Sequence, residues 1–393
     1  MTTNSTRILI ITRNLPPLVG GMERLNWHMA DELSNCNEVR IIGPKGAATI
    51  KPEKTSLTEA PLKPLSFFLL IAFCKALWLA WRWKPNVILA GSGLTAPLAW
   101  LASKLSGARS AVYLHGFDIT APSRVYQALW KPTFKKMDRV IVNSTPTKQL
   151  SLSAGVMEDK IHLVHPGVNL PKAPQPSKSI TTFKKQHGLK GKKLLLSVGR
   201  LTTRKGLREF VEHALPDIIR AEPNTVLLIV GEAPKNSLGA GIQTEESIKA
   251  QAQKSGVSEH LQFLGVITDQ RLLATVYEAS DVHIFPVRHI PDDPEGFGMV
   301  AIEAAAHGLP TVAFETGGII DAVSDGVSGH LVQNGDYQEL SKQVLAAIQH
   351  SFDVNCTQKF AQKFSWSHFG QKIFRALTVK AQDQSMRTGH HQR

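Results

Sequence analysis

Short apolar runs alternate with longer amphipathic stretches along most of the chain. Arg7–Thr12 (RILIIT) is typical of a buried strand, and Met22–Leu33 repeats apolar residues at spacings of three and four, which predicts a helix. Further strands are predicted at Val39–Ile42, Asn86–Ala90, Ser110–Leu114 and Arg139–Val142. Apolar strands separated by helices indicate a parallel sheet with helices on both faces.

The same alternation begins again after residue 190. Strands are predicted at Lys193–Val198, Thr225–Val230, Leu261–Leu264, Val282–Phe285 and Thr311–Ala313. Helices are predicted at Gly206–Ile219, Ser247–Lys254, Asp269–Glu278, Met299–His307 and Tyr337–His350. We therefore expect an α/β fold of two Rossmann-like, doubly wound domains that face a central cleft, because open parallel sheets bind ligands beyond the carboxyl ends of their strands.

A proline-rich stretch separates the two sets of elements. His165–Ser179 contains four prolines and no apolar periodicity, as an interdomain linker does. The predicted division is a first domain at 1–172, a linker at 173–190, a second domain at 191–382 and a polar tail at 383–393. The last helix of the second domain is a candidate to pack back on the first.

Composition is that of an ordinary globular protein. Of 393 residues, 42% are apolar and 20% are charged, which argues against disorder and against a disulfide scaffold. The three cysteines lie far apart and have neither framework nor zinc spacing. The first residues lack the basic start and cleavage site of a secretory signal. The expected location is the cytoplasm.

The charge is unevenly distributed. The net charge is +13, and residues 1–175 hold 21 Lys and Arg against 10 Asp and Glu, so that +11 lies in this part. Nucleic acid, anionic lipid and a phosphorylated substrate are all partners that such a surface attracts, and a generally basic soluble surface is the alternative. No nucleic-acid-binding motif accompanies the basic residues, so nucleic acid is not an expected partner.

One segment of the first half is unusually apolar. From Phe67 to Trp81 almost every residue is apolar, with Lys75 in the middle, and the run is short for a membrane span. The segment ends in three tryptophans and two basic residues, which suits an interfacial helix on an anionic membrane: Trp78, Trp81, Trp83, Arg82 and Lys84. We predict that helix 65–84 contacts a membrane, the alternative being a helix that only covers the sheet.

Two glycine-containing loops follow predicted strands. Gly20-Gly21 comes before the first helix, whose N-terminal N–H groups suit a phosphate. The segment Gly199–Gly206 brings Arg200, Arg204 and Lys205 to the carboxyl edge of the second sheet. Arginine binds phosphate oxygens with a planar fork and lysine as a point charge, so this loop is a candidate diphosphate site.

The strongest motif contains two carboxylates eight residues apart. Glu295 lies in a glycine-containing loop, and Glu303 lies in the first turns of the following helix. Glu303 is placed to accept hydrogen bonds from vicinal hydroxyls, and the N–H groups of Phe297–Val300 suit phosphate. In the first domain, His115 follows a strand and is a candidate to contact a reacting sugar or phosphate.

No metal is predicted. The Asp-x-Asp spacing of a metal-dependent sugar transferase does not occur, and Asp292-Asp293 are adjacent and followed by a proline. A further glycine loop, Gly317-Gly318, follows the strand at Thr311.

These motifs resemble those of the GT-B glycosyltransferases of family 4. The resemblance rests on Glu295-x7-Glu303, continued as AAAHGLPTVAFETGG, and on GRLxxxKG with Arg200 and Lys205. It implies a retaining transferase that uses a nucleotide-diphosphate sugar as co-substrate, with neither a metal nor another cofactor.

The resemblance also assigns roles. Arg200 and Lys205 would neutralise the donor diphosphate, Glu303 would bind the ribose, and Glu295 would contact the donor sugar. His115 would hydrogen-bond the sugar near the reacting centre. The residues assigned to catalysis are His115, Arg200, Lys205 and Glu295. The residues assigned to donor binding are Gly20, Gly21, Arg200, Lys205, Glu295, Phe297, Gly298, Met299, Val300 and Glu303.

The acceptor is expected to bind the first domain. A basic, tryptophan-rich first domain suggests a lipid-linked or cell-surface glycan acceptor, as in polysaccharide, lipopolysaccharide or glycolipid assembly. The enzyme would then work peripherally at the inner face of the cell membrane.

Other functions remain as alternatives. Gly91–Ala96 meets the G-x-G-x-x-A form of a dinucleotide-binding loop, which would suit an NAD-dependent oxidoreductase. A nucleotide-sugar epimerase or a phosphorylase would share the fold, and a non-catalytic sugar- or nucleic-acid-binding protein would share the charge.

Overall fold

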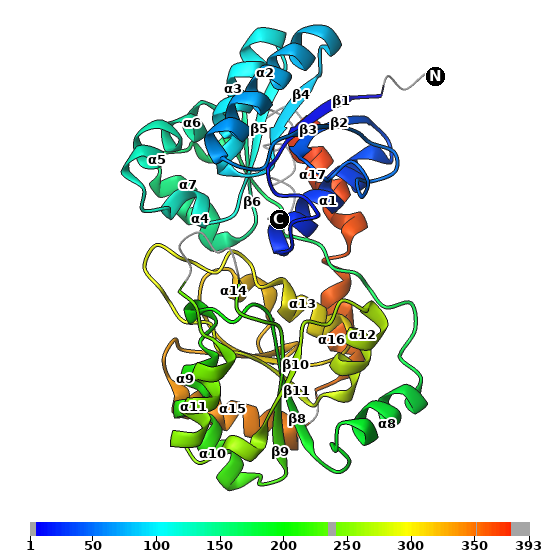
Figure 1. Ribbon diagram of the computed structural model, residues 1–393, viewed down its shortest axis with the longest axis vertical. Helices are drawn as coiled ribbons and strands as arrows, with labels where there is room; N and C mark the ends of the chain where they lie inside the picture. Colours follow the sequence, from blue (N-terminus) through cyan, green and yellow to red (C-terminus); the bar gives the residue numbers. More distant parts are fainter. Residues whose placement is uncertain (1–4, 235–240, 351, 379–393) are drawn as a thin grey trace, which may run out of the picture. The chain divides into compact units, whose positions relative to one another are not determined.

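The computed structural model describes residues 5–234, 241–350 and 352–378. The chain forms two compact units (Figure 1). The first unit joins the residues up to Gly167 with those from Trp366 onward, and the second is Val168–Ser365. The predicted polar tail, 383–393, lies outside the described residues.

The first unit is a parallel sheet between helices. In the described chain its strand order is β3-β2-β1-β4-β5-β6-β7. The strands are β1 (Arg7–Ile11), β2 (Glu38–Pro44), β3 (Ser56–Ala60), β4 (Val87–Ala90), β5 (Arg109–Leu114), β6 (Arg139–Val142) and β7 (Ile161–Leu163). The helices are α1 (Gly21–Ser34), α2 (Leu65–Trp83), α3 (Ala96–Ser106), α4 (Phe117–Thr120), α5 (Arg124–Leu129), α6 (Lys131–Lys136), α7 (Thr145–Ser153) and α17 (Trp366–Thr378).

The second unit repeats this architecture with the strand order β10-β9-β8-β11-β12-β13. Its strands are β8 (Lys193–Val198), β9 (Thr225–Val230), β10 (Leu261–Gly265), β11 (Val282–Phe285), β12 (Thr311–Phe314) and β13 (Gly329–Val332). Its helices are α8 (Ser177–Gln186), α9 (Leu207–His213), α10 (Leu215–Ala221), α11 (Glu245–Lys254), α12 (Gln270–Ala279), α13 (Met299–Ala306), α14 (Ile319–Ala322), α15 (Tyr337–Gln349) and α16 (Val354–Gln362). Two parallel α/β units confirm the predicted fold class.

The linker differs from the prediction. Residues 177–186, predicted within the linker, form α8, and Phe183 of this helix is buried in a cluster that includes Val276 and Tyr277 of α12. The boundary between the two units falls between Gly167 and Val168, whereas the first domain was predicted to end at residue 172. The helix begins directly after Pro176, the last proline of this stretch, so no proline interrupts it.

At the C-terminal side, the chain returns to the first unit as α17, which packs against α1 (red and blue in Figure 1). The helix predicted at Gly206–Ile219 is two helices, α9 and α10, divided at Ala214. Pro216 lies in the first turn of α10, where its missing N–H costs nothing, whereas inside one long helix it would remove a hydrogen bond.

The apolar segment forms α2, and its tryptophans divide between two environments. Phe68, Ala72 and Ala76 are buried against the sheet, which gives the helix a core-facing stripe. Trp78 and Trp81 are 58% and 65% exposed, whereas Trp83 is 6% exposed. The expected interfacial role of Trp83 is therefore wrong, because its ring packs into the core and its Nε1 donates to a Glu38 oxygen at 3.0 Å.

Candidate functional site

The predicted phosphate-binding loop follows β8 in the second unit. After Val198 the chain passes through Gly199 and Arg200 into a short 3₁₀ turn, Thr203–Lys205. Gly206 ends this turn with φ 68°, and a Cβ there would collide with the Pro286 carbonyl oxygen. A glycine is therefore required where the loop turns into α9, and the turn fixes the direction of the two preceding cations.

Lys205 and Arg204 both contact the first carboxylate of the acidic motif. The Lys205 Nζ donates to a Glu295 Oε2 at 2.9 Å, and the Arg204 Nε lies 3.3 Å from the same oxygen. The Arg204 Nη1 also donates to Asp293 Oδ1 at 2.6 Å. The side chains of Lys205 and Glu295 are only 19% and 11% exposed. The structure thus brings together two segments that lie 90 residues apart in the sequence.

Electrostatics fix the protonation state of Glu295. Burial acts to raise the pKa of its carboxyl, but Lys205, Arg204 and Arg200 together lower that pKa to about 2. Burial lowers the pKa of the Lys205 ammonium, and the Glu295 charge opposes that shift. At neutral pH Glu295 is a carboxylate that accepts hydrogen bonds.

A second glycine loop supports the Glu295 backbone. The Gly318 N–H donates to the Glu295 carbonyl oxygen at 2.9 Å. A Cβ on Gly317, which has φ 54°, would collide with that same oxygen, and a Cβ on Gly318 would collide with the Gly296 carbonyl oxygen. The Gly317-Gly318 pair therefore lets two loops approach closely, so the position of Glu295 depends on both.

The second carboxylate of the motif is positioned from α12. The hydroxyl of Tyr277 donates to a Glu303 Oε2 at 3.2 Å, and the Tyr277 ring stacks on His307 with centroids 5.3 Å apart. His307 in turn contacts a Glu278 oxygen at 2.9 Å. Tyr277 was not predicted as a site residue, because only the folding of the chain brings it to Glu303, 26 residues further on.

The remaining residues predicted to bind the donor lie around the start of α13. Gly298 caps this helix with φ 88° and provides no side-chain cap, so the first N–H groups are not satisfied by a capping side chain. Met299 and Val300 are partly buried at this helix start, and the Phe297 ring is buried in the core. Phe297 can therefore serve a ligand through its backbone alone. Arg200 is exposed and acts electrostatically on both Lys205 and Glu295.

In the first unit, His115 follows β5 and is buried. Its Nε2 lies 3.1 Å from the Gly91 carbonyl oxygen, and its backbone N–H donates to Asp118 Oδ2 at 3.0 Å. Burial raises the pKa of Asp118, and the His115 side chain opposes this shift. The Gly91 carbonyl, just after β4, thus orients the imidazole, and Asp118 of α4 holds the His115 backbone at the carboxyl edge of the sheet.

Gly20 and Gly21 also lie at this carboxyl edge. Gly20 is the N-cap of α1 without a side-chain cap bond, and Gly21 is exposed at the first position of the helix. Glu23, in the first turn, accepts a hydrogen bond from the Asn14 side chain at 2.8 Å. The uncapped helix start remains compatible with the predicted anion-binding role.

The alternative dinucleotide loop does not have the space that it needs. A Cβ on Gly91 would collide with Asn26 Oδ1, and a Cβ on Gly93 would lie 2.8 Å from the Asp118 Cβ. In addition, the Gly91 carbonyl oxygen accepts a hydrogen bond from Asn26. These glycines make room for protein side chains rather than for a pyrophosphate.

No cluster of three or more His, Cys, Asp or Glu side chains suited to a metal ion occurs among the described residues. Within the same part of the chain, α2 is the one helix that is long and apolar enough to cross a membrane by length and composition.

Comparison with known proteins identifies the class to which this fold and site belong. Residues 179–364 match the family model of glycosyl transferases group 1, and residues 19–172 match that of glycosyltransferase family 4. The chain belongs to the family 4 glycosyltransferases with the GT-B fold.

The relatives have more specific names. The chain is 28% identical over 301 residues to a D-inositol 3-phosphate glycosyltransferase of Nocardia farcinica, a match that covers 72% of this chain and 61% of that protein. It is 27% identical to a GDP-mannose-dependent alpha-(1-6)-phosphatidylinositol monomannoside mannosyltransferase of Mycolicibacterium smegmatis, over 86% of this chain and 88% of that protein.

A solved structure shows the same fold. Anabaena Alr3699/HepE in complex with UDP superimposes with a TM-score of 0.79 at 20% identity, over 95% of this chain and 99% of that one. WaaG, a glycosyltransferase involved in lipopolysaccharide biosynthesis, gives a TM-score of 0.65 at 16% identity, over 95% of this chain and 100% of that one.

Proposed function

We propose that this protein transfers a sugar, with retention of configuration and without a metal, from a nucleotide-diphosphate sugar to an acceptor held by the first unit. One observation carries the proposal: two cations, Lys205 and Arg204, converge on one buried carboxylate, Glu295, at the carboxyl edge of a parallel sheet. The relatives support the donor class, since one is named as GDP-mannose-dependent and one structural neighbour was solved with UDP-glucose.

The proposed chemistry uses charge rather than a metal. As the bond between the sugar and the diphosphate breaks, the leaving phosphate gains negative charge. The exposed Arg200, the N–H groups at the start of α13 and Lys205, which is held by Glu295, would stabilise this charge in the transition state. Glu303, held by Tyr277, would bind the ribose hydroxyls, and the ionised Glu295 would accept hydrogen bonds from the donor sugar.

The acceptor's proton has a destination in this scheme. Because the pKa of Glu295 is about 2, this carboxylate is a poor base at neutral pH, and we assign the proton to the leaving phosphate as the acceptor attacks from the same face. His115, fixed by the Gly91 carbonyl and Asp118, would hydrogen-bond the transferred sugar.

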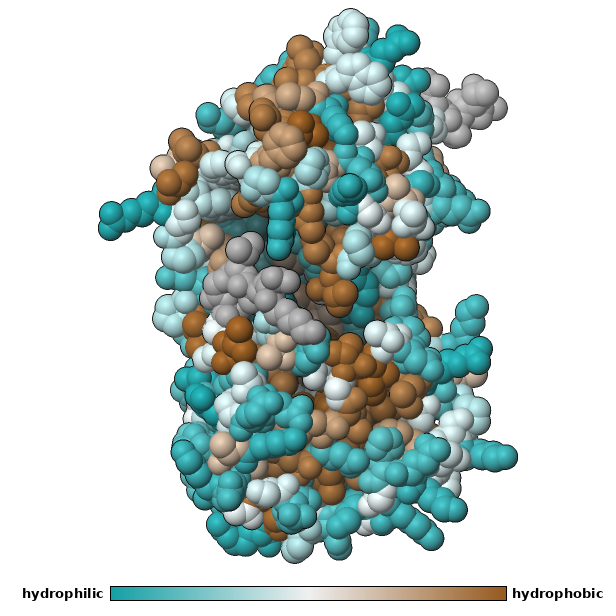
Figure 2. Space-filling view, viewed as in Figure 1, coloured by the Kyte–Doolittle hydropathy of each residue, from teal (hydrophilic) through white to brown (hydrophobic). Residues whose placement is uncertain are grey.

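We further propose a lipid-linked or cell-surface glycan acceptor and peripheral contact with an anionic membrane. The exposed apolar side chains of α2, with Arg82 in its last turn, are the supporting feature. Figure 2 shows apolar side chains gathered over α2 and α3. A relative whose name contains phosphatidylinositol monomannoside points in the same direction.

The donor is tested by thermal unfolding with UDP, GDP, ADP and NAD. A ligand at about 100 times its Kd stabilises the folded state by about 2.7 kcal/mol. We expect one nucleoside diphosphate to raise the Tm of the wild type and of the control Glu259→Ala, an exposed glutamate of the second unit, but not of Glu303→Ala. Stabilisation by NAD alone would contradict the proposal.

Retention is tested on the product. With the matching donor, proton NMR of the newly formed glycosidic bond should show the anomeric configuration of the donor. Inversion would overturn the retaining mechanism and leave the donor assignment intact.

A further inference from the structure

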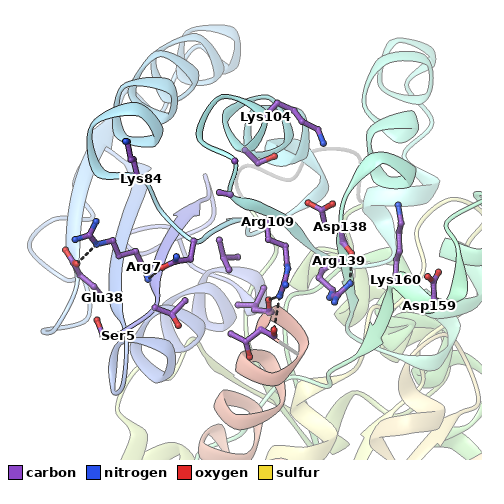
Figure 3. A pocket seen from close by; sticks show the side chains of 18 residues that line it. Ser5, Arg7, Glu38, Lys84, Lys104, Arg109, Asp138, Arg139, Asp159 and Lys160 are labelled. Atoms are coloured by element: carbon purple, nitrogen blue, oxygen red, sulfur yellow. Dashed lines mark hydrogen bonds and ion pairs between the residues drawn. The ribbon is translucent and has the colours of Figure 1, made fainter. Parts of the chain in front are cut away.

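Charged side chains outside the residues assigned to donor binding have different tasks in the two units. In the first unit they line a basic pocket at the amino ends of the strands (Figure 3). There the Arg109 Nη1 donates to the carbonyl oxygens of Leu377 and Thr378, at 2.6 and 3.0 Å, and stabilises the C-terminal end of α17. The Arg7 Nε lies 3.4 Å from a Glu38 oxygen. These arginines therefore have a structural role.

In the second unit, His307 and Glu278 form a largely buried pair next to Glu303. The His307 Nδ1 lies 2.9 Å from the Glu278 Oε1, and the two side chains are 13% and 11% exposed. A carboxylate only accepts hydrogen bonds, so Nδ1 carries the hydrogen of this contact. The Glu278 Oε2 accepts a hydrogen bond from the Gln175 backbone N–H at 2.6 Å. Both oxygens of Glu278 are therefore engaged, which fixes the direction of the imidazole.

The imidazole of His307 in turn supports the ring of Tyr277. The two rings are nearly parallel, at 5°, and their centroids lie 5.3 Å apart, as in offset stacking. Tyr277 is buried, and its hydroxyl donates to the Glu303 Oε2 at 3.2 Å. Glu303 lies in α13 and His307 follows four residues later at the end of this helix, so both are on one face and a single tyrosine reaches both.

Apolar packing alone does not account for a buried charged pair at this place. Burying a carboxylate costs free energy unless it is hydrogen-bonded, and apolar side chains of similar volume often stabilise a fold equally well. The apolar packing of α12 is supplied by other residues, since Val276 and Ala279 are buried in the cluster that contains Phe183. What the hydrogen-bonded pair adds is a fixed orientation of the His307 ring.

We propose that His307 and Glu278 are positioning residues that hold Glu303, through Tyr277, in the orientation that binds the two ribose hydroxyls. This inference rests on the proposed function, in which Glu303 accepts hydrogen bonds from the ribose. A carboxylate that is oriented before the nucleotide arrives loses less conformational freedom on binding, so the affinity is higher. The pair therefore favours ribonucleotides over nucleotides that lack these hydroxyls, without touching the ligand.

The test is isothermal titration of the full chain with a nucleoside diphosphate and with its 2′,3′-dideoxy form, which lacks the hydroxyls that Glu303 would bind. The nucleotide is whichever of UDP, GDP and ADP binds the wild type. The variants are His307→Ala and Glu278→Ala. The control is His260→Ala, because this half-buried histidine of the same unit contacts the Thr225 carbonyl oxygen at 2.8 Å, at the amino end of β9.

Each variant of the pair should weaken binding of the ribonucleotide by about threefold to tenfold and leave binding of the dideoxy form unchanged. The control should bind both forms like the wild type, even where its Tm falls. Adding Tyr277→Phe to His307→Ala should cause little further loss, because the effect passes through Tyr277. His307→Asn keeps a planar side chain with a donor near the position of Nδ1, and it should retain most of the wild-type affinity.

Wild-type affinity in both His307→Ala and Glu278→Ala would overturn the proposal. Equal weakening for the two forms of the nucleotide would also overturn it, because a general loosening of the fold has that effect. Glu303→Ala separates these failures from a failure of the proposed function. If Glu303→Ala also binds the ribonucleotide like the wild type, or if the wild type binds none of the three nucleotides, the proposed donor site is wrong and this inference falls with it.

Discussion

At the scale of single residues, Glu295 illustrates how two cations set the chemistry of a buried carboxyl. Burial favours the neutral acid, and Lys205 and Arg204 outweigh burial at distances of 2.9 and 3.3 Å. The resulting carboxylate keeps both cations in place before a donor binds. A donor diphosphate would share these cations with Glu295, so its binding and the position of Glu295 are coupled.

This ion pair predicts a defined dependence of stability on pH. The pKa of Glu295 falls from its ordinary value of 4.5 to about 2 on folding, so its contribution is complete above pH 4.5 and is lost as the pH drops towards 2. Lys205 stays protonated throughout this range. The free energy of unfolding of the wild type should therefore fall by up to about 3 kcal/mol more than that of Glu295→Gln between pH 5 and 2.

Urea unfolding at a series of pH values measures this difference. The control is Glu259→Gln, which removes an exposed carboxylate of the same unit and should keep the wild-type slope. Parallel curves for wild type and Glu295→Gln would mean that the ion pair does not form in solution.

Tyr277 offers a second prediction at this scale. Tyr277→Phe removes the hydroxyl that donates to Glu303 but keeps the ring stacked on His307. Loss of one hydrogen bond to a carboxylate should weaken donor binding by about threefold to tenfold, because Glu303 then loses one of the contacts that orient it for the proposed binding of the ribose.

Isothermal titration with the donor nucleotide measures the effect of Tyr277→Phe. Donor binding should weaken without a comparable change in Tm. This result would show that the Tyr277 hydroxyl positions Glu303 and that its loss does not disturb the packing of the ring. Unchanged affinity would show that Glu303 does not need its tyrosine partner.

At the scale of elements, the sequence predicted the central strands and missed three strands at sheet edges. β3, β7 and β13 all lie at an edge, and Ser56–Ala60 is largely half-buried or exposed. Central strands such as β9 are buried on both faces and give continuous apolar runs, whereas edge strands do not. A pattern of apolar residues therefore finds the middle of a parallel sheet more readily than its borders.

The residues of the candidate site also fall into two groups, those that the sequence predicted and those that only the structure reveals. The glycine loops, the basic loop and the two glutamates were found by residue type and spacing, because each lies within one short segment. The pairing of Lys205 with Glu295 and the contact of Tyr277 with Glu303 join distant segments, so only the folded chain reveals them. The return of α17 to the first unit is a contact of the same kind.

The close approach of Gly317 to the loop that carries Glu295 predicts that alanine destabilises the protein more at Gly317 than at Gly326. Gly317 and Gly326 both have positive φ, 54° and 70°, so alanine strains the backbone at either position. At Gly317 the added Cβ would also collide with the Glu295 carbonyl oxygen, whereas nothing lies within 4 Å at Gly326. Gly317→Ala should destabilise the second unit by about 1–3 kcal/mol more than Gly326→Ala.

Gly317→Ala should also weaken donor binding, since the displaced loop holds Glu295. Urea unfolding and donor titration of the two variants check both parts. Equal effects of the two alanines would show that the two loops do not need their close approach.

At the scale of the whole molecule, most of the net positive charge and an exposed apolar helix lie in the same half of the sequence. Residues 1–175 carry +11 of the net +13. The same half contains α2, whose outward side chains include Leu70, Trp78 and Trp81. Lys75 of this helix is directed to the Glu59 carbonyl oxygen, so the apolar face is not interrupted by its charge. The positive charge would attract this half of the chain to an anionic membrane, and insertion of Trp78 and Trp81 into that membrane would strengthen the binding.

These features predict salt-dependent binding to anionic vesicles. The wild type should sediment with vesicles that contain phosphatidylglycerol at low salt and should dissociate as salt screens the attraction, since the Debye length falls from about 10 Å at 0.1 M to about 3 Å at 1 M. Trp78→Ser with Trp81→Ser should bind more weakly at every salt concentration while keeping the same salt dependence, because it removes apolar contact and no charge. The matched control, Val266→Ser with Val354→Ser, changes two exposed apolar residues of the second unit and should bind like the wild type. If the tryptophan variant binds as well as the control, α2 only covers the sheet, and the proposed acceptor has to reach the enzyme without membrane contact at this helix.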